Sequence, residues 1–225
     1  MPNDELKPGL RAALRQHEIG SESPYKLFFA AKGKSGASFG FMQGDLAAGQ
    51  PEVRHTFEAV LADAGVDAPT ITALLQRLSV HLIANPLSAV ETARVNAALL
   101  AGRAKVDATD DLILTRVYDA LDTCIRIAQA AGRTIAPEAQ IYIALWINMT
   151  GPPTKLLKWL RGEDPELGRP VPIPSPVVSE VNIRAYLGAT DYFTENPRNF
   201  THMVESASVG VKLVRGTPSP TSSSG

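Results

Sequence analysis

Proline and glycine divide the chain from Pro51 onward into segments of helix length, and this division constrains the fold most. Proline suits the first turn of a helix, where its missing N–H would be unpaired anyway, and glycine suits the position after the last turn. Between them, apolar residues recur at spacings of three and four, as in Leu74, Leu75, Leu78 and Leu82. The pattern predicts helices over 51–64, 69–83, 87–100, 110–131, 137–148 and 154–161.

The two ends of the chain read differently. A short helix is expected over 10–18, and then glycines at 33, 36, 40 and 44 predict a loop with at most a short hairpin. Five prolines between Pro165 and Pro176 favour an extended arm, and further helices are expected at 180–187 and 200–209. We therefore predict a mainly α protein. Its single domain would span 1–215, with an irregular insert at about 20–48, a helical lobe at 51–162, the proline-rich arm and C-terminal helices at 163–212, and a disordered tail at 216–225.

Composition excludes several classes of function. The formal net charge is −1, and no stripe of lysine and arginine suggests a nucleic-acid partner. The single cysteine, Cys124, cannot form an intramolecular disulfide and is expected to be a buried thiol. The four histidines lack metal-ligand spacing, so no metal or other cofactor is expected. No apolar run is long enough to span a membrane, and the first residues show no signal-peptide pattern.

The first predicted helix ends in a candidate acid. Leu10, Leu14 and Glu18 are spaced by four and share one face. A carboxyl group that continues an apolar stripe is expected to be partly desolvated, which raises its pKa, as the general acid of a glycosidase requires. The simpler interpretation is that the stripe ends there and that Glu18 is its first exposed residue. His17 is expected to point away from Glu18, toward the surface.

The residues after Glu18 resemble those of phage lysozymes of the T-even type. In "HEIGSESPYK…GASFG" the glutamate precedes a Gly, a Tyr-Lys pair follows at plus seven (Tyr25), and a Thr-Ile-Gly-type element corresponds to Ser38-Phe39-Gly40. Further on, "ALWINMTGPPTKLLKWL" is similar to the Trp-x-Asn-x-Thr segment of that family. The resemblance implies a lysozyme-like fold, Glu18 as the acid, and Tyr25, Ser38, Trp146, Asn148 and Thr150 as substrate-binding residues.

A second resemblance overlaps the first. "IGSES…GASFGFMQGD" is similar to the goose-type lysozyme pattern, and lytic transglycosylases carry a Gly-x-x-Gln element at the same point. This alignment implies Glu22 as the acid, Gln43 in the substrate groove and Asp45 as the second carboxylate. The helix stripe and the Tyr25 offset favour Glu18 over Glu22.

One departure leaves the mechanism open. The phage-type family places an Asp nine residues after its Glu, and here that position is Leu27, so Asp45 is the nearest candidate partner. Carboxyl groups about 6.5–9.5 Å apart would allow inverting hydrolysis, whereas a single acid would allow a lytic transglycosylase. A non-catalytic lysozyme-like module of a phage or secretion apparatus, or a chitosanase-like enzyme, is the alternative.

Together these features favour a muramidase that cuts the β-1,4 bond between N-acetylmuramic acid and N-acetylglucosamine, with peptidoglycan strands as its partner. Without a signal peptide, it would reach the cell wall by release or secretion. The segment "ATDYFTENPRNF" carries Tyr192, Phe193, Phe200 and two asparagines. It suits either sugar binding or packing on the core.

Overall fold

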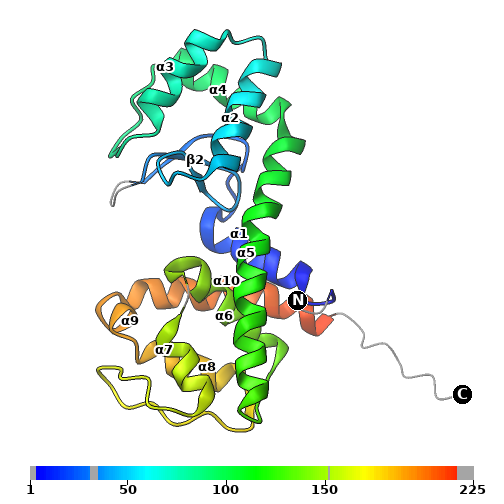
Figure 1. Ribbon diagram of the computed structural model, residues 1–225, viewed down its shortest axis with the longest axis vertical. Helices are drawn as coiled ribbons and strands as arrows, with labels where there is room; N and C mark the ends of the chain where they lie inside the picture. The colour runs from blue at the N-terminus through cyan, green and yellow to red at the C-terminus, as the bar shows by residue number, and fades with distance from the viewer. Residues whose placement is uncertain (1–3, 31–34, 152, 217–225) are drawn as a thin grey trace, which may run out of the picture. The chain divides into compact units, whose positions relative to one another are not determined.

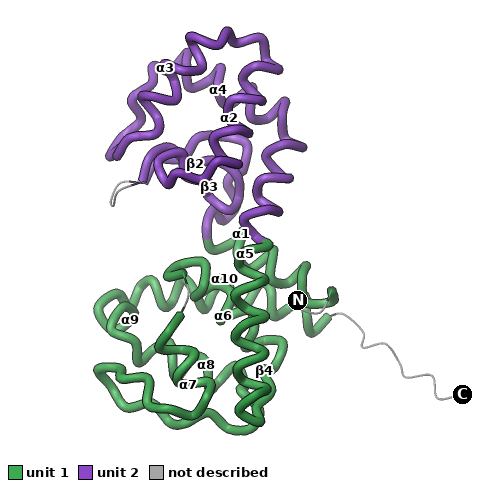
Figure 2. Tube along the Cα trace, in the orientation of Figure 1, with its two compact units in different colours: residues 1–17, 115–225 green, residues 18–114 purple. Residues whose placement is uncertain are grey.

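The computed structural model describes residues 4–30, 35–151 and 153–216, and these residues are mainly helical (Figure 1). By its contacts the chain forms two compact units, which we describe separately: unit 1, Met1–His17 with Thr115–Gly225, and unit 2, Glu18–Leu114 (Figure 2). The helices are α1 (Lys7–Ile19), α2 (Pro51–Asp63), α3 (Ala68–Leu78), α4 (Ala89–Ala101), α5 (Arg103–Ala130), α6 (Pro137–Thr150), α7 (Thr154–Arg161), α8 (Glu180–Gly188), α9 (Asp191–Glu195) and α10 (Pro197–Gly216).

The predicted mainly α character is confirmed, with corrections at the element ends. Helix α3 ends at Leu78, five residues early, because the next segment pairs with a loop instead: the Leu82 N–H donates to the Ser35 carbonyl at 3.0 Å. Helix α5 begins at Arg103, directly after the Gly102 cap of α4, and not at Asp110. Helix α9 was not predicted. The division into two units leaves the single lysozyme-like domain over 1–215 a prediction, and residues 217–225 of the expected tail lie outside the described residues.

In unit 2, the glycine-rich segment forms a small antiparallel sheet of β1 (Phe28–Phe29), β2 (Ala37–Phe39) and β3 (Gly44–Asp45). The register places Ser38 opposite Asp45 and Phe39 opposite Gly44. One face of the sheet joins the apolar core built by α2, α3, α4 and the first half of α5, where Phe39 packs near Phe57 with ring centroids 6.1 Å apart. The sequence predicted a loop with at most a short hairpin, and the structure exceeds this prediction with a third strand.

In unit 1, helix α6 is the central element, because its residues from Ile141 to Ile147 are all buried. Helices α8 and α10 pack against it. The proline-rich arm is extended, as predicted, and ends in β5 (Val177–Val178), which pairs in parallel with β4 (Thr134–Ile135). The Trp159 indole N–H holds the arm by donating to the Pro172 carbonyl at 2.9 Å.

Helices α1 and α10 approach each other closely within unit 1. A Cβ placed on Gly210 would lie 2.3 Å from the Gly9 carbonyl oxygen, and one on Gly9 would lie 2.9 Å from the Gly210 carbonyl. Only glycine at both positions allows this backbone separation. The contact fixes the first helix, which carries Glu18 near its end, against the C-terminal helix.

The environment of Cys124 and the apolar character of the helices can be compared with the expectations from composition. Cys124 is fully buried, as predicted, and desolvation raises the pKa of its thiol to about 12, so it is protonated and unreactive at neutral pH. Among the described helices, none combines the length and apolar character that a membrane span requires.

His17 is half-buried and packs against a second helix, whereas the helix geometry predicted a surface role. Its ring stacks on His202 of α10 at a centroid distance of 4.8 Å, and the ring of His202 hydrogen bonds the His17 carbonyl at 2.9 Å. The His17 Nδ1 atom is buried without a hydrogen-bond partner among the described residues. Desolvation, and then the charge of His202, lowers the pKa of His17 to about 4.

This histidine predicts acid sensitivity of unit 1. Between its unfolded pKa of 6.5 and its folded pKa of about 4, the unfolded chain binds a proton that the folded chain does not. Stability is therefore lost as the pH falls from 6.5 to 4, on the order of 2 kcal/mol from this residue. When the free energy of unfolding in urea is measured across this pH range, it should depend less steeply on pH in His17→Gln than in the wild type. The exposed His55 provides the control, since His55→Gln should keep the full slope; equal slopes for the wild type and His17→Gln would contradict this assignment.

Candidate functional site

The predicted site residues fall in both units. Unit 2 holds Glu18, Glu22, Tyr25, Ser38, Gln43 and Asp45, and unit 1 holds Trp146, Asn148 and Thr150. In the first group Glu18 lies in α1, Ser38 and Asp45 lie in the small sheet, and the others lie in the loops between; the second group lies on the last turns of α6.

A buried carboxylate holds the turn between β2 and β3. Asp110 of α5 is 1% exposed and accepts hydrogen bonds from the N–H of Phe41 (2.9 Å) and of Met42 (3.0 Å). Gly40 has a φ of +79°, and a Cβ there would lie 2.3 Å from the Asp110 carboxylate. Glycine at position 40 is thus required both by its backbone conformation and by the closeness of the carboxylate.

Sequence reasoning missed Asp110, although the sequence holds a signal for it. Val106, Leu114 and Tyr118 are all buried on α5, and Asp110 lies four residues from both Val106 and Leu114 on the same face. A charged residue on the buried face of a long helix must be paired with something. Placing the start of this helix at Asp110 concealed the signal, because an acidic residue at a helix start needs no further explanation.

The anchored turn carries Gln43 in an unusual conformation. Its φ of 52° lies in the left-handed region, which few residues other than glycine adopt. The Ser38 hydroxyl donates to the Gln43 side-chain oxygen at 2.8 Å, which fixes the amide group. Backbone strain of this kind persists only where the surroundings impose it, and it is concentrated at functional sites. Ser38 and Gln43, predicted from two different resemblances, are thus in direct contact.

Asp45 lies directly opposite Ser38 across the β2–β3 pair. Its Oδ1 accepts the N–H of Gly36 at 2.9 Å and of Ala47 at 2.8 Å, so the carboxylate is oriented by the backbone. Within the described residues, Oδ2 accepts no hydrogen bond. The residue is half-buried. Asp45 therefore shapes the turn with one oxygen and has the other available for a ligand or water.

Glu18 lies in the last turn of α1 and is half-buried. The two leucines of its stripe, Leu10 and Leu14, are fully buried, so the apolar face extends up to the glutamate as predicted. The residue takes part in an interaction within the molecule. Glu18 is therefore a partly desolvated carboxyl group at the end of a rigid helix.

Glu22 is in a different environment. Its side chain is 60% exposed and pairs with the Lys26 ammonium at 2.5 Å, four residues along the chain. The same ammonium lies 5.1 Å from the centre of the Phe28 ring. The resulting arrangement is an exposed ion pair of a kind common on protein surfaces.

Tyr25 ties the start of the loop to α5. Its hydroxyl donates to the carboxylate of Asp107, 3.1 Å from Oδ1, and its ring packs against the core. Two residues on, Leu27 is buried, and its N–H donates to the Asn96 side-chain oxygen at 2.9 Å. The position where the phage-type pattern has an aspartate is thus part of the apolar core. Tyr25 has a structural role here, whatever else it contacts.

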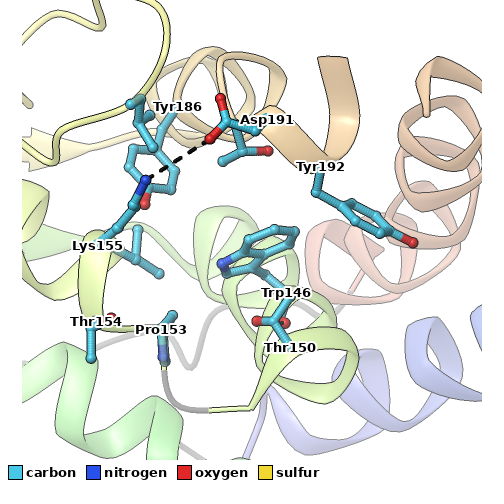
Figure 3. Close-up of a pocket in the computed structure, with 11 residues that line it drawn as sticks. Trp146, Thr150, Pro153, Thr154, Lys155, Tyr186, Asp191 and Tyr192 are labelled. Carbon is cyan, nitrogen blue, oxygen red and sulfur yellow. Dashed lines mark hydrogen bonds and ion pairs between the residues drawn. The ribbon is translucent and has the colours of Figure 1, made fainter. Parts of the chain in front are cut away.

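In unit 1, Trp146 and Thr150 line one pocket of about 240 Å³ (Figure 3). The remaining lining residues come from α7, the arm, α8 and α9 and their junctions: Pro153, Thr154, Lys155, Leu156, Leu167, Tyr186, Thr190, Asp191 and Tyr192. Trp146 is 8% exposed and meets Tyr192 edge-on at 6.1 Å. Sequence analysis named two of these residues as substrate-binding but did not find Tyr186, Lys155 or Asp191, which come together only in the fold.

Of the other residues that the sequence singled out in this region, one lines the pocket wall and the rest lie outside it. Asn148 is half-buried and is not part of the pocket wall. Of the aromatic segment, Tyr192 lines the pocket, whereas Phe193 is buried and packs against Phe200 with centroids 5.2 Å apart. The Asn199 amide donates to the Tyr192 hydroxyl at 2.9 Å. The packing interpretation therefore holds for Phe193, while sugar binding by Tyr192 stays a prediction.

Within residues 4–30, 35–151 and 153–216, no group of three or more His, Cys, Asp or Glu side chains could hold a metal ion. Comparison with known protein families, with curated proteins and with solved structures gave no match for this chain.

Replacing one carboxylate oxygen of Asp110 should destabilise the turn between β2 and β3. Asp110→Asn replaces one accepting oxygen by an NH₂ group, which faces a backbone N–H that it cannot pair with. A buried donor left unsatisfied costs about 1–3 kcal/mol, so the free energy of unfolding should fall by about 2 kcal/mol. Urea unfolding measures the loss, and amide hydrogen exchange should accelerate at Phe41 and Met42.

The control is Asp119→Asn, an exposed aspartate on the same helix. It should leave both the stability and the exchange at Phe41 and Met42 unchanged. Unaltered exchange at these two amides in Asp110→Asn would show that the carboxylate does not hold the turn.

Proposed function

We propose that the chain is a lysozyme-type glycosidase that cleaves the β-1,4 bond between N-acetylmuramic acid and N-acetylglucosamine in peptidoglycan. The proposal rests on the resemblances of 10–50 and 137–160 to lysozymes. The observation that carries it furthest is the organised turn in unit 2, where Ser38, Gln43 and Asp45 adjoin one another on a small sheet held by a buried carboxylate.

Asp45 and Ser38 suit the positioning of a water molecule. They are direct cross-strand neighbours, so their side chains lie on the same face of the sheet. The Asp45 Oδ2 atom has acceptor capacity toward water, while Oδ1 is held by two backbone N–H groups. A carboxylate oriented in this way can accept a proton from the attacking water, which is the task of the base in an inverting glycosidase.

Glu18 is the preferred acid over Glu22. The acid of a glycosidase must keep its proton near neutral pH, and such acids are typically carboxyl groups in partly apolar surroundings. Glu18 is half-buried at the end of an apolar stripe, whereas Glu22 is exposed and pairs with Lys26. The environments of the two residues therefore support the choice made from the helix pattern.

In the proposed reaction Glu18 donates its proton to the glycosidic oxygen as the bond to the anomeric carbon breaks. Water attacks the anomeric carbon and gives its proton to Asp45, so that the configuration inverts. Gln43 and Ser38 would hydrogen bond the sugar or the water beside this carbon. Trp146, Asn148 and Thr150 remain substrate-binding residues by resemblance.

A second candidate function has one observation in its favour. Leu27 stands where the phage-type pattern has an aspartate, and it is built into the core, so no carboxylate can lie there. A lysozyme-like module that binds glycan strands without cutting them would need no such group. This module would bind purified cell walls and release no soluble product from them.

The proposal predicts that Glu18→Gln abolishes most activity. General acid catalysis contributes about 10²–10⁴-fold, and release of reducing sugar from purified cell walls should fall by this factor. Asp45→Asn should cause a loss of similar size if Asp45 is the base.

The matched control is Glu22→Gln, which removes a carboxylate four residues away and should retain nearly full activity. The reverse outcome, loss in Glu22→Gln and retention in Glu18→Gln, would move the acid to Glu22. No release of sugar by the wild-type chain at high enzyme concentration would favour the binding module.

A further inference from the structure

The pocket of unit 1 contains a tyrosine hydroxyl to which none of the described residues is hydrogen-bonded. Tyr186 is 1% exposed, and its ring packs against Trp159 with centroids 4.8 Å apart. Its hydroxyl is not a buried atom, and the residue lines the pocket, so the small exposed part of the side chain opens there. A tyrosine ring combines apolar surface with one polar group, and a hydroxyl that opens onto a pocket can hydrogen bond water or a ligand. Burial raises the pKa of this hydroxyl, so it is a neutral donor and acceptor at neutral pH.

The aromatic residues of the pocket form a gradient from floor to rim. Tyr186 and Trp146 are 1% and 8% exposed, whereas Tyr192 is 40% exposed. Figure 3 shows the indole of Trp146 among the labelled side chains, with Tyr192 on one side of it and Lys155 on the other. A ligand in this pocket would meet aromatic carbon at the floor and along one side of the rim. Such surfaces favour the C–H faces of a compact ring.

The charges of the pocket cancel. The Lys155 ammonium lies 4.0 Å from Asp191 Oδ2, and both side chains are more than half exposed at the rim. The ammonium also donates to the Glu166 carbonyl at 2.9 Å. A balanced pair gives no net attraction for an anion or a cation, but it offers donors and acceptors to hydroxyl and amide groups. Thr154 also lines the pocket, and its hydroxyl can both donate and accept a hydrogen bond.

We infer that this pocket binds one neutral sugar ring, an N-acetylhexosamine unit of a glycan strand, with Tyr186 at its floor and Tyr192 at its rim. A volume of about 240 Å³ lies below that of pockets for drug-sized ligands, about 300–1,000 Å³, and suits a single small ring. The ligand class rests on the proposed function, whereas the pocket itself does not. Through this pocket the chain would bind the polymer without using any of the proposed catalytic residues.

The test is a titration of the full chain carrying Glu18→Gln, which should bind sugar without cutting it. The probes are N-acetylglucosamine and its β-1,4-linked dimer, followed by the two tryptophan indole N–H signals in a ¹H–¹⁵N spectrum. The Trp146 signal should shift and saturate. The Trp159 signal should shift less, because its N–H is bonded to the Pro172 carbonyl and its ring packs on Tyr186 from outside the pocket lining.

Two variants examine the named contacts. Tyr186→Phe removes only the hydroxyl and should weaken binding about fivefold, while Tyr192→Ala should weaken it about tenfold. The matched control is Tyr142→Phe, another buried tyrosine of unit 1, whose hydroxyl bonds Glu180 at 3.1 Å. It should keep the affinity but lower the melting temperature, whereas Tyr186→Phe should not lower it, since no bond is lost.

Unchanged affinity in both pocket variants, or binding of a zwitterionic dipeptide in place of the sugars, would overturn the inference. Its failure is distinguishable from failure of the proposed function. A wild-type chain that releases no sugar from cell walls, while its pocket variants lose affinity, would contradict the glycosidase alone. An active enzyme whose pocket variants bind sugar normally would contradict the pocket alone.

Discussion

The hydrogen bonds from the Phe41 and Met42 N–H groups to Asp110 are the interaction on which the candidate site depends. A glycine-rich segment of this length has little apolar surface with which to hold its own shape, and its ordering costs backbone entropy. A carboxylate inside unit 2 compensates by satisfying two adjacent N–H groups from a long helix. Tyr25 adds a second tie to the same helix through Asp107. The turn that carries Gln43 is thereby anchored to the helix behind it.

This anchoring explains how Gln43 can keep a left-handed backbone conformation while its side chain contacts Ser38. The contact from Ser38 fixes the amide group, and the β2–β3 register places Asp45 opposite the same serine. Three side chains that are separated by up to seven positions in the sequence thus share one surface. Their arrangement supports a polar, oriented site, and the chemistry assigned to it remains our proposal.

The sequence predicts the helices well because proline, glycine and apolar spacing act locally. Helix α7 has the predicted ends, α2 differs by one residue at its C-terminal end only, and α4 differs by two residues at its start and one at its end. The errors arise where distant contacts decide. The pairing of Leu82 with Ser35 ends α3 early, and β4 pairs with β5 some forty residues away. His17 was misplaced for the same reason, because nothing near it in the sequence reveals the stacking on His202.

The site shows the same division. Contacts within the 36–47 turn follow from residues that the sequence marks, whereas Asp110 and Tyr186 are brought in by helices from elsewhere in their units.

The central claim is that the chain cuts glycan strands, and mass spectrometry of muropeptides after digestion of purified cell walls tests it most directly. The account predicts new disaccharide-peptides with a reducing N-acetylmuramic acid end. Products with a 1,6-anhydro end would contradict the role of Asp45 as a base that activates water, and the absence of any soluble product would contradict glycosidase activity altogether.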